Sequence, residues 1–197
     1  MTIDQPPTRA DARANRARLL AAAHEVLRER GPDAEMKEIA ERAGVGVGTI
    51  YRNFPTKDDL IVAIVTEMVE QIRENIEAAS AIEDPIEAIH ALLRRGFALH
   101  DRFGYMAAAM GGHIPAACIP LFMELNPVAR MEPLIRRGIA TGVFRDDLDV
   151  ELTADYLANS FKPSFFVQRS AEERARAFAA LFLHGMLAHP EGRATGA

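Results

Sequence analysis

The sequence predicts an all-α protein, and two observations lead to this prediction. Apolar residues recur at spacings of three and four along most of the chain, and no segment of any length alternates between apolar and polar residues. Capping residues, glycines and prolines separate these periodic segments from one another. With 197 residues the chain can bury a sizeable core, in one large or two small domains. We expect about nine helices, the first three forming a small unit and the others a larger bundle.

The boundaries of these helices follow from their capping signals. A Ser, Thr, Asp or Asn that can accept hydrogen bonds from the first turn precedes most of them. A Gly-Pro pair stops the first helix, and a Gly-Gly pair follows the sixth. Pro133 should kink the seventh helix or mark its first turns, and Pro163 should strain the last turn of the eighth. In order, the expected helices run over about residues 8–30, 36–43, 47–53, 56–80, 84–104, 105–110, 126–141, 147 or 149 to 166, and 170–189.

The segment 35–54 carries the most specific pattern in the chain. Its first helix ends at Gly44, a residue suited to the positive φ that closes a helix. In its second helix Ile50 and Phe54 lie about one turn apart and can both point inward. The pattern predicts a helix-turn-helix, whose second helix lies in the major groove of DNA. An ordinary helical hairpin is the alternative. The residues left on or near the outer face of the second helix are Val47, Gly48, Thr49, Tyr51 and Arg52.

The run AERAGVGVGTIYRNFPTKDDL resembles the DNA-binding signature of TetR-type transcriptional regulators. In that family a Gly-Thr-aliphatic-Tyr run is followed by a basic or polar pair, a Phe, and a Lys that opens the next helix. The resemblance covers about residues 12–66 with specific motifs, and beyond them only size, helical character and position. It implies a sequence-specific regulator, not an enzyme, that binds double-stranded DNA at a palindromic operator as a homodimer.

The resemblance also implies roles for individual residues at the DNA. Thr49 and Tyr51 match positions whose hydroxyls contact phosphate, with Tyr51 also able to touch bases. Lys57 matches a phosphate-contacting lysine. Arg52 and Asn53 fall where the family varies, and their chemistry suits phosphate or guanine and phosphate or adenine, respectively. The full expected DNA-binding set is Lys37, Val47, Gly48, Thr49, Tyr51, Arg52, Asn53 and Lys57.

Three features depart from the family pattern. Gly46 stands where a Ser or similar residue usually caps the recognition helix, at a cost of roughly a few tenths of a kcal/mol. Val47 replaces a residue that is often polar, although its side chain can pack on a thymine methyl group. Ala34 and Glu35 stand where many members carry phosphate-contacting Thr residues, and Glu35 would repel phosphate. We therefore expect modest affinity for each half-site.

The last two expected helices carry the predicted dimer surface. The final helix is apolar on most sides, which indicates burial from several directions, and a second subunit is a natural source of that cover. TetR-like proteins dimerise through the corresponding pair of helices. The expected dimer residues are Tyr156, Phe161, Phe178, Leu181 and Phe182.

The central third of the chain predicts a cavity for a small apolar ligand. Deformable Met side chains and Phe residues gather there beside glycines and prolines, a composition that suits an adaptable apolar pocket. A plain core is the alternative for any single Phe or Met, and a structural role is the alternative for each histidine. The expected ligand-binding residues are Phe97, His100, Phe103, Met106, Met110, His113, Phe122 and Met123.

Composition excludes several classes of protein. The net charge is −5, but residues 1–60 hold equal numbers of basic and acidic residues, so the acidic excess lies in the remainder. Cys118 is the single cysteine, which fits a reducing cytoplasm. We find no signal peptide, no apolar run long enough for a membrane, no metal-binding spacing of the histidines, and no motif for a catalytic nucleophile or cofactor. We expect a cytoplasmic protein with no metal, no cofactor and no membrane partner.

These expectations combine into a repressor that a small apolar ligand releases from its operator. Two alternatives stay open: the same fold regulating without a small-molecule ligand, and a helical small-molecule-binding protein whose DNA-binding unit is vestigial. The expected divisions are a disordered tail (1–8), a helix-turn-helix domain (9–55, motif 35–54), a connecting helix (56–80), a ligand-binding and dimerisation domain (81–190) and a second tail (191–197).

Overall fold

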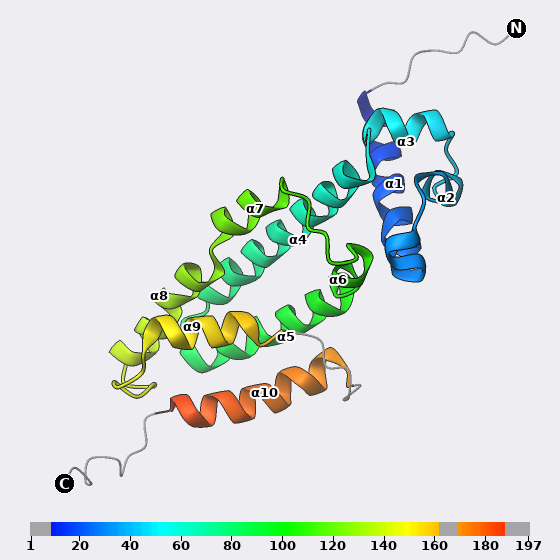
Figure 1. The fold of residues 1–197 in the computed structure, drawn as a ribbon. Coiled ribbons are helices and arrows are strands. Elements are labelled where there is room, and N and C mark those ends of the chain that lie inside the picture. The colour runs from blue at the N-terminus through cyan, green and yellow to red at the C-terminus, as the bar shows by residue number, and fades with distance from the viewer. Residues whose placement is uncertain (1–8, 162–168, 188–197) are drawn as a thin grey trace, which may run out of the picture. The chain divides into compact units, whose positions relative to one another are not determined.

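The computed structural model describes residues 9–161 and 169–187, which form helices joined by turns (Figure 1). The all-α prediction is confirmed. A single pair of residues, Phe144 and Leu187, forms an isolated β-bridge among the described residues. The elements are α1 (Arg9–Arg30), the 3-10 helix η1 (Gly31–Asp33), α2 (Met36–Arg42), α3 (Val47–Asn53), α4 (Lys57–Ser80), α5 (Pro85–Phe103), α6 (Met106–Ala109), α7 (Cys118–Leu125), α8 (Pro127–Ala140), α9 (Val150–Asn159) and α10 (Ala171–Met186).

The capping side chains act as the sequence predicted. Asp84 accepts hydrogen bonds from two amides in the first turn of α5. Ser170 and Glu173 form a complete capping box at the start of α10, each side chain bonding the backbone of the other. Of the two aspartates proposed to open α9, it is Asp149 that caps the helix, whereas Asp147 pairs with an arginine.

Two predicted helix ends were placed too late. α9 ends at Asn159, because the hydroxyl of Ser160 donates to the carbonyl of Leu157 at 2.7 Å and the chain turns there. α10 ends at Met186, three residues before the predicted end. The structure describes neither residues 1–8, 162–168 nor 188–197, so both predicted tails, the Thr8 cap and Pro163 lie outside the described residues.

The helix α7 was not predicted. Its segment contains Pro120, and a proline often interrupts a helix. Pro120 is the third residue of α7, a position whose N–H has no partner within a helix, so the proline costs no hydrogen bond. α8 likewise continues past Pro133 as one helix.

The described chain falls into two compact units. The first holds residues 9–67 and 105–120, and the second holds residues 68–104 and 121–187, so α4 contributes to both. Over the residues that the structure describes, no helix combines the length and the apolar character needed to cross a membrane. The buried side chains of the first unit include Leu19, Ala23, Val26, Leu27, Ile39, Ala40, Ile50, Phe54, Leu60 and Ile64.

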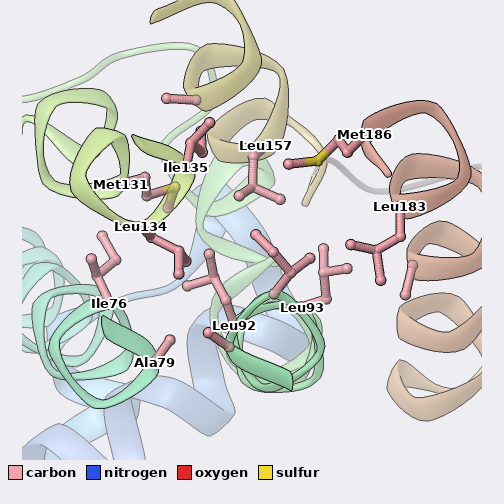
Figure 2. Close-up of a cluster of buried hydrophobic side chains, with 14 of the residues drawn as sticks. Ile76, Ala79, Leu92, Leu93, Met131, Leu134, Ile135, Leu157, Leu183 and Met186 are labelled. Carbon is pink, nitrogen blue, oxygen red and sulfur yellow. The ribbon is translucent and has the colours of Figure 1, made fainter. Parts of the chain in front are cut away.

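The second unit has its own apolar core, to which five helices contribute. Side chains from α4, α5, α8, α9 and α10 point toward a common centre (Figure 2). Gly138 on α8 is needed for this packing, because a Cβ there would lie 2.1 Å from the ring of Phe144. The guanidinium of Arg137 donates to the carbonyls of Ser80 and Ile82, the first at 2.8 Å, and so satisfies acceptors at the end of α4. The labelled core residues are Ile76, Ala79, Leu92, Leu93, Met131, Leu134, Ile135, Leu157, Leu183 and Met186.

Candidate DNA-binding surface and ligand cavity

The turn between α2 and α3 is a Schellman motif. The amide of Val45 donates to the carbonyl of Ala40 at 3.0 Å, and the amide of Gly44 donates to that of Glu41 at 3.1 Å. Gly44 has φ of 65°, in the left-handed region that glycine adopts at least cost. The turn therefore satisfies the last carbonyls of α2 and directs the chain into α3.

Two buried side chains hold α3 against the first unit. Ile50 and Phe54 are almost fully buried, one turn apart, as the sequence predicted. The guanidinium of Arg16 on α1 lies 4.4 Å from the centre of the Phe54 ring, a cation–π contact. With its inner face fixed in this way, α3 can expose only its opposite face.

The exposed face of α3 carries the side chains that sequence analysis assigned to DNA. Tyr51 is 48% exposed, and Val47, Gly48 and Arg52 are also exposed. The Nη2 of Arg52 donates to Oγ1 of Thr49 at 3.1 Å. The Nδ2 of the half-buried Asn53 donates to the carbonyl of Thr49 at 2.8 Å. Arg52 and Thr49 thus form one polar group on the surface, whereas the amide of Asn53 is held against its own helix.

The start of α4 follows α3 directly and is fixed by a capping box. The amide and hydroxyl of Thr56 donate to the Asp59 carboxylate, at 2.9 and 2.7 Å, and the Asp59 amide donates to the Thr56 hydroxyl at 3.1 Å. The ammonium group of Lys57 donates to the carbonyl of Pro32 at 2.6 Å. An ammonium group has three N–H donors, so Lys57 retains two for a phosphate oxygen.

The helices α1 and α2 carry charged pairs. Arg42 at the end of α2 joins Glu25 and Glu29 of α1, at 3.1 and 2.9 Å. The hydrogen bond from Arg42 holds the pKa of Glu29 below its ordinary value. Lys37 lies 3.8 Å from Glu41, one turn away on α2, and is exposed. Glu35 precedes α2 without a capping hydrogen bond from its side chain.

A cavity of about 350 Å³ lies within the second unit. Among the described residues its lining is almost entirely apolar, and the polar side chains in it are those of Asn75 and His100. Part of the lining, Ile76, Leu92 and Met131, comes from α4, α5 and α8 (Figure 2). The other lining residues are Met68, Ile72, Gly96, Leu99, Phe103, Gly104, Phe122, Leu125, Pro127, Ala158 and Phe161.

The imidazole of His100 is the most distinctive group of this lining. A Cβ on Gly104 would lie 2.8 Å from its Nε2, so the glycine leaves the space that the ring occupies. Burial, and then the positive charge of Arg174, hold the pKa of His100 below its ordinary value. A neutral imidazole offers one N–H donor and one acceptor nitrogen to a bound molecule.

Comparison with known proteins assigns the chain to a family. The family model described as bacterial regulatory proteins, tetR family, matches residues 19–64, from the middle of α1 into α4. The protein belongs to the TetR family. Members of this family are DNA-binding regulators, not enzymes.

The relatives extend this assignment beyond the matched segment. A fatty acid metabolism regulator protein of Bacillus subtilis (strain 168) is 24% identical over 144 residues, covering 68% of this chain and 73% of the relative. The solved TetR transcription regulatory protein from Mycobacterium vanbaalenii is 28% identical, with a TM-score of 0.64, covering 91% of this chain and 99% of that one. The regulator FadR from Bacillus subtilis in complex with stearoyl-CoA is 20% identical, with a TM-score of 0.68, covering 86% and 98%. The TetR fold therefore includes the second unit.

Only some of the residues expected at the ligand site line the cavity in the structure. His100, Phe103 and Phe122 line the cavity, whereas Phe97 is buried beside it, with its ring 5.2 Å from that of Phe161. Met123 is 74% exposed. The other three, Met106, Met110 and His113, lie in the first unit.

Most of the cavity wall was not identified from the sequence. The residues of α4 that line it, such as Met68 and Ile72, belong to the segment that the sequence predicts as a connecting helix. The spacing of three and four along α4 would have marked an apolar face there, but not which part of that face borders empty space.

The residues expected at a dimer surface differ in exposure. On α9, Tyr156 is 60% exposed, and on α10, Leu181 is 77% exposed. Phe178 and Phe182 are half-buried, and their rings stack with centres 5.2 Å apart. Phe161 contributes to the cavity instead. This TetR-family chain thus presents large apolar side chains on its last two described helices.

Proposed function

We propose that this protein is a transcriptional repressor that binds a palindromic operator as a homodimer and leaves it when a small, largely apolar ligand fills the cavity of the second unit. The observation that carries the proposal is the exposed face of α3. Tyr51 and the Arg52–Thr49 pair lie there, on a helix whose other face is anchored by Ile50 and Phe54. Such a face combines hydroxyl and guanidinium donors for phosphate with groups that can reach base edges.

At the DNA, the proposed contacts follow from each side chain's chemistry. Tyr51, Thr49 and Lys57 donate to phosphate oxygens and set the position of α3 in the groove. Arg52 exchanges its bond to Thr49 for phosphate or guanine, while Val47 packs on a thymine methyl group and Gly48 allows close approach. Lys37 adds a phosphate contact, and Asn53 reaches phosphate or adenine when its bond to the helix opens.

The homodimer is proposed from the apolar side chains on α9 and α10. Leu152, Tyr156 and Leu181 are exposed in the single chain, and a two-fold partner would bury them. Two α3 helices then face successive major grooves, roughly 34–36 Å apart. Leu181→Glu should yield monomers in light scattering and weaken operator binding. Met123→Glu, at a similarly exposed position outside these helices, should leave the dimer intact.

The ligand step is proposed from the helix α4. Its residues Met68, Ile72 and Ile76 line the cavity, and its first residue, Lys57, follows α3 after a short turn. A ligand that shifts α4 would change the spacing of the two α3 helices. Coupling of about 1–3 kcal/mol would weaken operator binding roughly 5–150-fold. The stearoyl-CoA complex of the Bacillus subtilis neighbour supports a ligand-responsive role for this fold.

Footprinting of DNA flanking the gene, across a salt series, tests the DNA-binding part. We expect a protected palindrome whose binding falls steeply with salt. Lys57→Ala should lower the salt slope by about 1, and Tyr51→Phe, which removes only a hydroxyl, should weaken binding at all sequences. Arg176→Ala, an exposed cation on α10, is the control and should leave the slope unchanged. Normal operator binding by a Tyr51→Ala, Lys57→Ala double variant that melts like the wild type would refute these assignments.

A further inference from the structure

The described lining of the cavity in the second unit contains polar side chains but no charged ones. Asn75 and His100 are its polar side chains, and no lysine, arginine, aspartate or glutamate belongs to the described lining. A charged group transferred into such surroundings without a partner loses far more hydration energy than it regains. The described part of the lining therefore favours a neutral group over a charged one.

Three arginines that contact residues at or beside this cavity already have partners. Arg102 donates to Gln71 and lies over the ring of Phe103, at 5.0 Å from its centre. The Nε of Arg130 donates to the carbonyl of Leu125 at 2.6 Å. Arg174 pairs with Asp101 and lies over the ring of Phe97. An anionic ligand would have to share these cations with the partners that they already have.

The neutral polar groups, by contrast, are available to a ligand. In the described part of the chain the imidazole of His100 makes no hydrogen bond, and its ring lies beside Gly104. Asn75, on the neighbouring wall formed by α4, adds an amide that can donate or accept. One oxygen atom on an otherwise apolar ligand can hydrogen-bond to His100. The volume of about 350 Å³ also lies at the small end of the usual range for ligand pockets.

We propose that the ligand of this cavity is a small neutral molecule, apolar over most of its surface, whose single carbonyl or hydroxyl oxygen hydrogen-bonds to His100. This inference rests on the proposed function, because it names the ligand class of the same site. It differs from an acyl-CoA ligand, whose phosphates need cations, and from a fatty acid anion. His100 is here a specificity-determining residue, since it selects the ligand's oxygen while the apolar wall supplies most of the contact.

Calorimetric titration of the full chain with ten-carbon probes tests the inference. The probes are the methyl ketone decanone, the hydrocarbon decene, the anion decanoate and the thioester decanoyl-CoA. We expect decanone to bind most tightly, and decanoate to bind at least roughly tenfold more weakly. His100→Phe should weaken decanone binding roughly 3- to 10-fold relative to decene. His90→Phe, on the same helix but outside the cavity, should leave that ratio unchanged.

Because these titrations contain no DNA, their outcome is separate from that of the operator experiment. Tighter binding of decanoate or decanoyl-CoA than of decanone would overturn the ligand class and leave the repressor proposal intact. Absence of binding by every probe would overturn it too. An unchanged ratio of decanone to decene affinity in a folded His100→Phe variant would remove His100 from the site. Selective binding of decanone by a protein that protects no DNA would support the ligand class and refute the repressor.

Discussion

The DNA-binding surface and the ligand cavity are assembled from very different stretches of chain. The exposed face of α3 comes from a single short helix, Val47–Asn53, and the turn that orients it lies directly before that helix. The cavity wall is drawn from α4, α5, α7, α8 and α9, over residues from Met68 to Phe161. A surface of the first kind depends on a few local anchors, whereas a cavity depends on how several helices fail to fill the space between them.

The largest expected effect is a loss of stability on removing the buried ring of Phe54, compared with removing the ring of Phe122 in the cavity wall. Phe54→Ala should cost about 3–5 kcal/mol of stability, because the ring is almost fully buried under α3 and its loss leaves a void. Phe122→Ala removes a partly exposed ring at the edge of the cavity, so much less buried surface is lost. Chemical denaturation of both variants measures the difference. Equal losses of stability would show that the two regions do not differ in this way.

A smaller effect is expected where the cavity wall is tightest. A Cβ at Gly96 would lie 2.2 Å from the ring of Phe161, so Gly96→Ala forces that ring to move. Overpacking costs roughly 1–3 kcal/mol, offset by up to about 1 kcal/mol from the better helix propensity of alanine. Ligand affinity should change while operator binding without ligand does not, as measured by calorimetry and footprinting. Gly185→Ala, where a Cβ meets open space, is the control.

The same contrast explains what the sequence could predict. Gly44, Ile50, Phe54 and the Thr56–Asp59 cap each signal their role through neighbours a few residues away, and the structure contains each of these features. The DNA-contacting roles of the α3 residues remain predictions, since they concern a partner and not the fold.

From the sequence, only the kinds of side chain around the cavity could be predicted. Phe and Met side chains signal apolar burial, but Phe97 fills a core beside the cavity and Met106 is buried in the other unit. Which of them borders empty space depends on the packing of residues distant in sequence, such as Gly96 against Phe161. α7 was missed for a related reason, because the effect of Pro120 depends on its position within a helix whose start carries no clear cap.

The smallest expected effect concerns the ion pairs that join α1 to α2 beneath the helix-turn-helix. The pKa of Glu29 is lowered in the folded protein, chiefly by the hydrogen bond from Arg42, so ionised Glu29 favours folding. This contribution is fully present above the carboxyl's unfolded pKa and is lost as the pH falls through the lower folded value. Glu29→Gln should therefore reduce stability near neutral pH slightly and flatten its decline in acid, with both effects weakened by salt because the pair is exposed. Thermal melts across an acidic pH series measure this, with Glu83→Gln, an exposed carboxylate of the second unit, as the matched loss of one charge. If Glu29→Gln and the wild type lost stability in parallel as the pH fell, the Arg42–Glu29 pair would not stabilise α2 against α1. The position of the DNA-binding surface would then depend on its buried side chains and on the turn at Gly44.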